Sequence, residues 1–283
     1  MAKYKNFLGL GIAGNFALHL AQAGELEDFK DIITEDEAAP KGMFPFYLPS
    51  EGINKAELHA KEILSTYPLS SEYIRLPKED VNVQAEPEVG LVCELEYTAG
   101  KLSKITPTYF GAYNDCSIRV AGAEKISDKK NWGADSKGFS NTLFAIDKFE
   151  EAGLIDNFSI ASFLVRDSEI HPYGEDVELT GYSYFYEKLT DWIQNQILTQ
   201  EDFGPLEAIE EYILACNNPT EAIISIGATR YTEYGESTFL QQGDEVIIVL
   251  YDNTKLTYES MLEAVKNKSF DTQTMSVLVQ KVI

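Results

Sequence analysis

The chain has 283 residues, and 44% of them are apolar, which is enough to bury a sizeable core in a globular protein. Its formal net charge at pH 7 is −23, because 46 acidic residues outnumber 23 basic ones. A surface of this sign repels phosphate backbones and anionic lipid headgroups. We therefore expect no nucleic-acid partner and no membrane partner.

The spacing of the cysteines and the length of the apolar runs indicate the cellular compartment. Cys93, Cys116 and Cys216 are scattered, a spacing typical of neither a disulfide framework nor a zinc site, and this favours a reducing compartment. The N-terminus lacks the cleavage site that would follow the apolar core of a signal peptide, and no run of roughly 18 apolar residues occurs. We expect a cytoplasmic protein.

The N-terminal part predicts a strand, a helix and an extended aromatic segment. A buried strand is expected within residues 5–12 and a helix over 15–24, with Asn15 as its N-cap. Residues 25–41 are acidic and predict a loop. The aromatic segment 43–49 contains two prolines, which favour an extended piece lying on a surface or pocket.

The remainder of the chain is mostly strand. β-Branched and aromatic residues with turn punctuation predict strands at 72–77, 81–100, 104–118, 158–167, 176–186, 221–229, 244–253 and 274–283. Strands 158–167 and 176–186 are expected to form an antiparallel pair through a turn at 172–175. Helical spacing predicts helices at 186–198, 205–218 and 257–267. With no internal repeat and no linker, we predict one α+β domain, mainly β, with peripheral helices.

Residues 9–14 read GLGIAG and satisfy the G-x-G-x-x-G fingerprint of dinucleotide-binding proteins. Confirmation needs a second strand that ends in Asp or Glu about 20 residues on, with further βαβ alternation. The following segment offers only a fragment of strand and no such alternation. A glycine-rich turn that packs closely is the better interpretation, and a nucleotide-dependent oxidoreductase is the alternative.

Two glutamates are the first candidates for a cation site. Glu86 and Glu88 lie two positions apart before an apolar run, so in a strand both side chains point to the same face. Neighbouring carboxylates repel unless a cation or protons neutralise them, and oxygen ligands suit Mg²⁺, Mn²⁺ or Ca²⁺. A solvated strand edge gives the same pattern, and Glu94 and Glu96 share the spacing, so the motif alone is not decisive.

A third acid lies further along the chain. Asp115 is surrounded by aromatic and small residues at the end of an apolar strand, where a charge needs a partner. Lys137 follows in the sequence SKGFS, at the end of a glycine-containing loop.

The order of these motifs resembles the fumarylacetoacetate hydrolase (FAH) family. Glu-x-Glu with an apolar strand is followed by N-D-x-S-x-R and then by K-G-F. The resemblance implies an FAH-like mixed β-sandwich or β-roll, in which residues 1–55 pack on a core formed by 56–283. It also implies roles for single residues: Glu86, Glu88 and Asp115 as metal ligands, Lys137 as a substrate contact, and Arg119 as a substrate-side residue or a structural ion-pair former.

The N-terminus carries the same resemblance and one departure from it. The sequence GNFALH is similar to the family opening G-x-N-Y-x-x-H, and this explains GLGIAG without a nucleotide. Hydrolytic relatives place a glutamate three residues after the helix histidine, which here is His19. The corresponding residue is Gln22, which cannot accept a proton at neutral pH. His19 is thus either a catalytic base acting alone or a packed histidine.

The resemblance implies an enzyme that uses Mg²⁺ or Mn²⁺, with Ca²⁺ as an alternative, on a small 2-oxo acid or 1,3-dicarbonyl compound. Such sites carry out C–C hydrolysis, decarboxylation or isomerisation through an enolate that the metal stabilises. Without the dyad glutamate, decarboxylation or isomerisation gains over hydrolysis. The family also implies a homodimer. The alternative is a degenerate FAH-like protein that binds a small acid or a metal without turnover.

Overall fold

The computed structural model describes residues 1–17, 19–32, 34, 36–49, 61–120 and 122–283. The strands of its largest sheet are β1 Leu8–Ala13, β2 Gly42–Tyr47, β3 Leu69–Ser70, β6 Pro87–Thr98, β7 Lys101–Asn114, β9 Lys137–Phe139, β10 Phe144–Ala145 and β13 Glu221–Ser225. Their order is β2-β1-β13-β6-β7-β9-β3, and β10 pairs with β7. β1 runs parallel to β13, whereas β13, β6 and β7 are antiparallel neighbours.

The second sheet has five strands and a regular antiparallel centre. It consists of β4 Tyr73–Ile74, β11 Phe158–Arg166, β12 Glu169–Glu178, β14 Glu245–Asp252 and β15 Met275–Val282. Their order is β12-β11-β14-β15-β4, and only the β15–β4 edge is parallel. A separate two-stranded sheet pairs β5 Asn82–Gln84 with β8 Ser117–Arg119.

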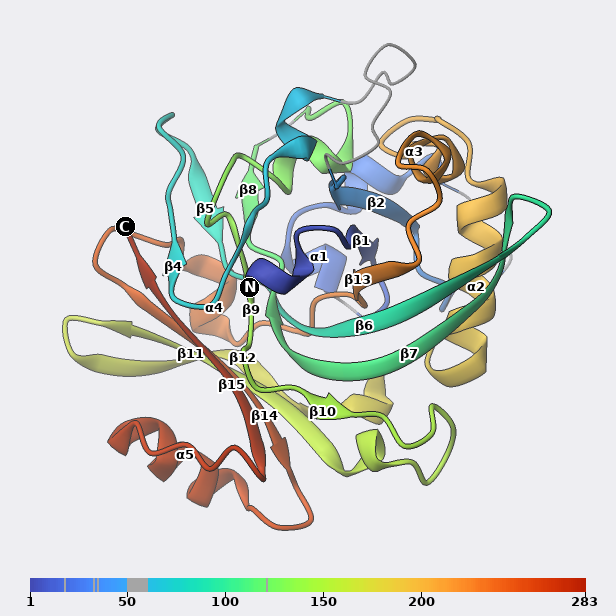
Figure 1. The fold of residues 1–283 in the computed structure, drawn as a ribbon. Coiled ribbons are helices and arrows are strands. Elements are labelled where there is room, and N and C mark those ends of the chain that lie inside the picture. Colours follow the sequence, from blue (N-terminus) through green and yellow to red (C-terminus); the bar gives the residue numbers. More distant parts are fainter. Residues whose placement is uncertain (18, 33, 35, 50–60, 121) are drawn as a thin grey trace.

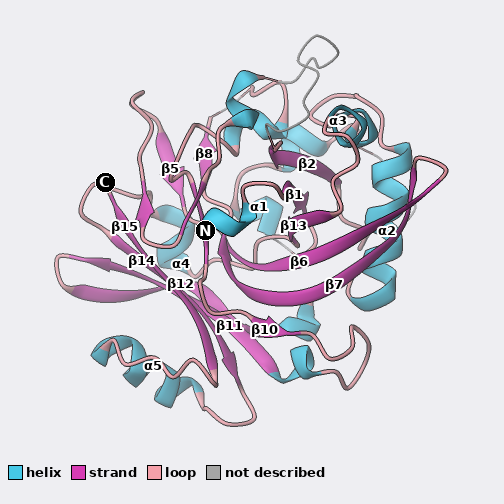
Figure 2. Ribbon diagram, in the orientation of Figure 1, coloured by secondary structure: helices cyan, strands magenta, loops and turns pink. Residues whose placement is uncertain are grey.

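Helices accompany the sheets. They are α1 His19–Gln22, α2 Tyr186–Thr199, α3 Ile209–Ala215, α4 Glu233–Ser237 and α5 Tyr258–Asn267. The two longest, α2 and α5, lie outside the sheets, as Figure 2 shows. Short 3-10 turns include η4 Ile126–Lys129 and η6 Leu179–Gly181. The predicted class, α+β and mainly β with peripheral helices, is confirmed.

The core fills the space between the two large sheets. Leu91 and Phe110 of the first sheet belong to the same buried apolar cluster as Ile160 and Leu250 of the second. On the outer face of the second sheet, α5 covers a smaller cluster that includes Met261 (Figure 1). The central strands β11 and β14 are therefore buried on both faces, which explains their continuous apolar runs.

The β6–β7 hairpin is the longest paired element and determines where the candidate site lies. Its turn places Ala99 and Gly100 at φ of 53° and 81°, the conformation that a two-residue hairpin turn requires. Register shifts after Val92 and Glu96 accompany the curl of the two strands seen in Figure 1. At the open end of the hairpin Pro87 pairs with Asn114, so the residues before β6 and after β7 are neighbours.

The glycines of the GLGIAG motif are explained by packing. A Cβ atom on Gly9 would overlap the ring of Phe46, and one on Gly11 would overlap the ring of Phe44. Both aromatic residues belong to β2, which is antiparallel to β1. The motif therefore lets two aromatic rings lie directly on the backbone of β1, as the close-packing interpretation expects.

Two predictions for the N-terminal part differ from the structure. The helix expected over 15–24 is only His19–Gln22, and the Asn15 side chain donates to the carbonyls of Tyr184 and Ile226 instead of capping a helix. The aromatic segment expected on a surface or pocket is the fully buried strand β2, because its rings fill the space over β1.

The antiparallel pair expected over 158–167 and 176–186 has different bounds in the structure. β12 begins at Glu169, and the turn lies at Asp167–Ser168, where both residues have positive φ, instead of at 172–175. Residues 179–181 form the turn η6 and are not part of the strand. The predicted boundary between residues 55 and 56 lies outside the described residues. Within the described part of the chain, no helix combines the length and the apolar character needed to cross a membrane.

The packing of Phe44 on Gly11 gives a stability prediction. We expect Gly11→Ala to lower the free energy of unfolding by about 1–3 kcal/mol, because a well-packed aromatic ring must move. Urea denaturation measures the loss. Combining the change with Phe44→Leu should cost less than the sum of the two single changes, since the smaller side chain removes the overlap. Strictly additive losses would contradict the packing explanation.

Candidate metal centre

Glu86 and Glu88 lie at the start of β6, and both are 2% exposed. The rival pair, Glu94 and Glu96, is exposed near the other end of the same strand. The two pairs differ in exposure because other residues cover only one end of the strand. Aromatic residues such as Tyr113 and Phe139 cover the strand next to Glu88, whereas β6 is open to solvent around Glu94. Burial therefore separates two motifs that have the same spacing.

Asp115 follows β7 directly and meets the first glutamate across the hairpin. Its backbone N–H donates to the carbonyl of Glu86 at 3.0 Å, and its side chain is fully buried. The side chain of Asn114 accepts from the backbone N–H groups of Glu86 and Cys116 and donates to Gln280. This one buried amide fixes the two chain segments that carry the acids.

The three acids converge. Glu86, Glu88 and Asp115 each offer one oxygen, and these oxygens lie within 4.8 Å of one another. Three buried carboxylates cost free energy unless a cation or protons neutralise them. Oxygen-only ligands are those that Mg²⁺, Mn²⁺ and Ca²⁺ prefer. The residues present therefore fit a hard divalent cation.

Protein cations also contact these acids. Lys130 Nζ lies 2.5 Å from Glu86 Oε2 and 2.5 Å from Asp115 Oδ2. Lys137 Nζ lies 2.6 Å from Asp115 Oδ1 and also donates to the carbonyl of Asp115. Arg119 Nη2 lies 2.6 Å from Glu86 Oε1. Both oxygens of Glu86 and both oxygens of Asp115 therefore have a cationic partner.

A fourth carboxylate, Glu25, extends the network. It accepts from Arg119 at 2.8 Å and from Lys129 at 2.9 Å. Arg119 further donates to Gln84 and to the hydroxyl of Tyr231, so each of its three nitrogens has a protein partner. The cluster thus contains four carboxylates and four cations: Glu25, Glu86, Glu88 and Asp115 with Arg119, Lys129, Lys130 and Lys137.

Glu88 differs from the other two acids of the triad. Its hydrogen-bond partner in the described part of the chain is the backbone N–H of Gly227, which donates to Oε2 at 3.0 Å. Burial, followed by the charges of Asp115 and Glu86, raises the pKa of Glu88 well above its usual range. Burial would also raise the pKa of Glu86, but Lys130 and Arg119 outweigh it and hold that pKa low. The triad therefore combines an ionised member with one that favours a proton.

His19 lies beside the acids and Gln22 does not. The Nδ1 atom of His19 is 2.9 Å from the carbonyl oxygen of Thr229, so Nδ1 carries the hydrogen and Nε2 has the free lone pair. Burial lowers the pKa of His19, which favours the neutral ring. Gln22 instead donates to the carbonyl of Tyr231 and accepts from its N–H. Gln22 therefore holds the backbone of Tyr231 through two hydrogen bonds. This structural contact stands in place of the histidine–glutamate dyad of the hydrolytic relatives.

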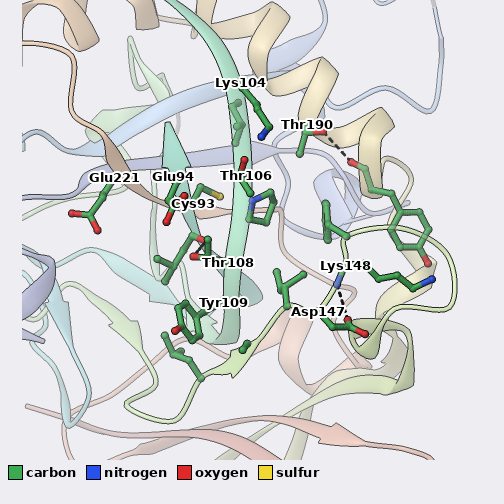
Figure 3. Close-up of a pocket in the computed structure, with 18 of the residues that line it drawn as sticks. Cys93, Glu94, Lys104, Thr106, Thr108, Tyr109, Asp147, Lys148, Thr190 and Glu221 are labelled. Atoms are coloured by element: carbon green, nitrogen blue, oxygen red, sulfur yellow. Dashed lines mark hydrogen bonds between the residues drawn. The ribbon is translucent and has the colours of Figure 1, made fainter. Parts of the chain in front are cut away.

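The space at the site is small. His19, Glu86, Glu88 and Lys130 line a cavity of about 10 Å³, enough for roughly one water molecule. A much larger hollow of about 1190 Å³ lies elsewhere, along β6 and β7 and the segment 141–151. Figure 3 shows its lining, which includes Cys93, Glu94, Tyr109 and Lys148 and none of the site residues predicted from the sequence.

Sequence reasoning missed several members of this cluster. Lys130 and Lys129 occur in the charged stretch SDKKNW, which resembles a solvated loop. Glu25 lies in a segment that is acidic throughout, so nothing distinguishes it from its neighbours. Asn114 had a signal, because it belongs to the N-D-x-S-x-R motif that identified Asp115 and Arg119. The predicted roles of the six site residues stay predictions, although the fold brings these residues together.

Proteins with solved structures share this fold. A 2-keto-3-deoxy-D-arabinonate dehydratase complexed with magnesium and 2,5-dioxopentanoate is 15% identical, with a TM-score of 0.50 over 98% of this chain and 72% of that one. A candidate fumarylacetoacetate isomerase/hydrolase from Oleispira antarctica is 10% identical, with a TM-score of 0.50 over 98% and 93% of the two chains. An uncharacterized protein from Mycobacterium abscessus is 11% identical, with a TM-score of 0.51 over 98% and 78%. The fold is therefore FAH-like, as the order of the motifs predicts.

A family model matches most of the chain. The model, described as a family of unknown function (DUF5718), matches residues 25–282, and the chain belongs to that family. No curated protein matches the sequence.

The buried ion pairs give a second stability prediction. We expect Arg119→Met to lower the free energy of unfolding by about 3–5 kcal/mol, because Glu25 and Glu86 then lose a buried cationic partner. The matched control is Arg75→Met, which removes an ion pair to Asp135 whose arginine side chain is 57% exposed, and should cost less than about 1 kcal/mol. Chemical denaturation of both variants measures the difference. Equal losses would show that Arg119 is not essential to the buried network.

Proposed function

We propose that this protein is a metal-dependent enzyme that acts on a small 2-oxo acid or 1,3-dicarbonyl compound. The observation that carries the proposal is the convergence of Glu86, Glu88 and Asp115, with His19 beside them and Lys137 on Asp115. Buried carboxylates next to a free imidazole nitrogen and a buried ammonium are the parts that proton abstraction next to a carbonyl needs. Mg²⁺ or Mn²⁺ is the preferred ion because all three acids offer oxygen.

The bound ion would act as a Lewis acid that polarises the substrate carbonyl and stabilises negative charge as it develops. Lys137 would add positive charge near the same place, since its ammonium is buried and held by Asp115. Arg119 has protein partners on all three nitrogens, which favours the ion-pair role over a substrate contact.

His19 would move the proton. Its ring is fixed by the Thr229 carbonyl, and its neutral form leaves Nε2 free to accept. Hydrolysis would need a second group that helps to activate water, and Gln22 is committed to the backbone of Tyr231. Decarboxylation or isomerisation is therefore favoured over C–C hydrolysis. The magnesium-containing dehydratase of the same fold supports an oxo acid as the kind of substrate.

A second function has a specific observation in its favour. The cavity at the acids is about 10 Å³, far smaller than a pocket that encloses an oxo acid. A degenerate protein that binds only a metal ion, without turnover, would need no larger space. The two functions differ in one measurable property, which is turnover in the presence of the metal.

Turnover of oxaloacetate and a panel of acylpyruvates with Mg²⁺ or Mn²⁺ tests the proposal. We expect Glu88→Gln to lower kcat/KM by at least about 100-fold, because the variant lacks one oxygen ligand of the ion. The matched control is Glu94→Gln on the exposed part of the same strand, which should leave the rate unchanged. Metal binding without turnover of any substrate would favour the degenerate protein. Activity that survives Glu88→Gln unchanged would defeat the metal mechanism.

The role of His19 predicts a pH dependence. Because burial lowers its pKa from 6.5, the ring loses its proton below that pH, and the base is ready at neutral pH. We expect kcat/KM to rise with pH through a midpoint below 6.5 and to stay level above it. His19→Asn should lower kcat by about 100-fold or more and remove this acidic limb. If the acidic limb of the pH profile persists in His19→Asn, the group that titrates is not His19.

A further inference from the structure

Lys130 already places a positive charge among the acids of the triad. Its Nζ atom bridges Glu86 Oε2 and Asp115 Oδ2 at 2.5 Å each, and its side chain is 5% exposed. The ring of Phe44 lies 5.3 Å from the ammonium on another side. No sequence motif pointed to this residue.

We propose that Lys130 is a built-in competitor of the divalent metal: its ammonium binds the carboxylates of Glu86 and Asp115, and a metal ion enters the triad only when that ammonium leaves. The inference rests on the proposed function, because it takes the triad as the metal site. It goes beyond that function by assigning to one lysine the control of metal affinity.

Lys130 occupies the position that an incoming ion would take. The two oxygens that Lys130 contacts belong to two of the three residues that would bind the ion. The other oxygens of these residues are paired with Arg119 and Lys137. An ion that approaches Glu86 and Asp115 therefore meets a cation at every oxygen of both carboxylates. Of these three cations, Lys130 is the only one that contacts both acids in the described structure.

Electrostatic repulsion also opposes a metal ion while Lys130 is in place. Glu25, Glu86 and Asp115 each contact two protein cations, so their charge is already neutralised. A divalent ion would add two positive charges close to the ammonium in an environment of low dielectric, where like charges repel strongly. Withdrawal of Lys130 removes one of these charges and frees two oxygens at once.

Lys130 has a flexible side chain beside an anchored backbone. The side chain of the neighbouring Asn131 donates to the carbonyls of Phe46 and Thr66. The lysine side chain is a flexible four-carbon stem with a point charge, and its ammonium contacts the two carboxylates. Release of the ammonium would then be a rotation of this stem, while Asn131 holds the neighbouring backbone.

The experiment measures Mn²⁺ binding by electron paramagnetic resonance in the full-length protein and in Lys130→Met. We expect the variant to bind Mn²⁺ at least about tenfold more tightly, because the apparent affinity of a site falls with the fraction of molecules in which it is available. Lys125→Met is the matched control, since Lys125 pairs with Asp202 and with the carbonyls of Gly204 and Leu206, away from the triad. It should leave the affinity unchanged.

Two further variants locate the effect. Lys130→Arg keeps the charge and should bind Mn²⁺ about as weakly as the wild type. Lys130→Met/Glu88→Gln should lose the gained affinity, because the ion then lacks a triad carboxylate. If Lys130→Met fails to fold, the side-chain ¹⁵Nζ resonance of Lys130 in the wild type provides the readout, assigned with Lys130→Arg. Saturating Mg²⁺ should shift that resonance, and an unchanged resonance in metal-saturated protein would overturn the inference.

The outcomes separate this inference from the proposed function. Mn²⁺ binding only after removal of Lys130 supports the inference and refutes a metal-dependent wild-type enzyme. Equal Mn²⁺ affinity in the wild type and Lys130→Met, together with metal-dependent turnover, refutes the inference and leaves the proposed function standing. Absence of binding in both proteins refutes both.

Discussion

The neutralisation of buried carboxylates is the constraint on which the site depends. Glu25, Glu86, Glu88 and Asp115 are each at most 8% exposed, and an unpaired buried charge costs several kcal/mol. The fold meets this cost with cations from separate segments: Arg119 from β8, Lys129 and Lys130 from the end of η4, and Lys137 from β9. Three successive segments that follow the hairpin, together with Glu25 from the N-terminal part, are thereby tied to the hairpin's open end. The ion pairs hold the segments together, and the segments in turn fix the positions of the acids.

The β6–β7 hairpin converts a short motif into a site by giving one strand two different environments. Glu88 and Glu94 are both on β6, yet only the first lies under the aromatic residues that cover the start of the strand. Asn114, at the end of β7, then accepts from the backbone N–H of Glu86 and so joins β7 to the start of β6. The same amide reaches Gln280 of the second sheet, so the position of the acids depends on the packing of both sheets. A carboxylate site at the end of a hairpin alone would lack this support.

Much of this arrangement could be predicted from local patterns, and the rest depended on long-range packing. The helices α2 and α5 and the strands β11, β14 and β15 follow their apolar spacing, and the FAH-like fold follows from the order of the motifs. The helix at 15–24 was predicted too long because Asn15 bonds to Tyr184 and Ile226, contacts that no local pattern reveals. The buried role of Lys130 could not be predicted, since its neighbours are charged and polar and its partners lie at least 15 positions away. A charged side chain is buried where an oppositely charged partner is available, and which residue is that partner depends on the fold.

A lysine that binds two carboxylates of a proposed metal site would change the relation between metal and folding. Sites whose acids have no other partner need the ion to fold, because the acids would otherwise repel in a buried space. Here the ammonium of Lys130, with Arg119 and Lys137, neutralises Glu86 and Asp115 without a metal, so the hairpin end can form before any ion arrives. On the proposal above, the same contacts would weaken metal binding, because the ion would have to exchange with a tethered cation. Glu88 has no ion-pair partner within the described residues, and burial favours its protonated form, so a bound ion would have to displace a proton there. Lys130 and Glu88 would thus have complementary roles, because the ammonium stabilises the metal-free cluster and Glu88 would become a charged ligand only with the ion present.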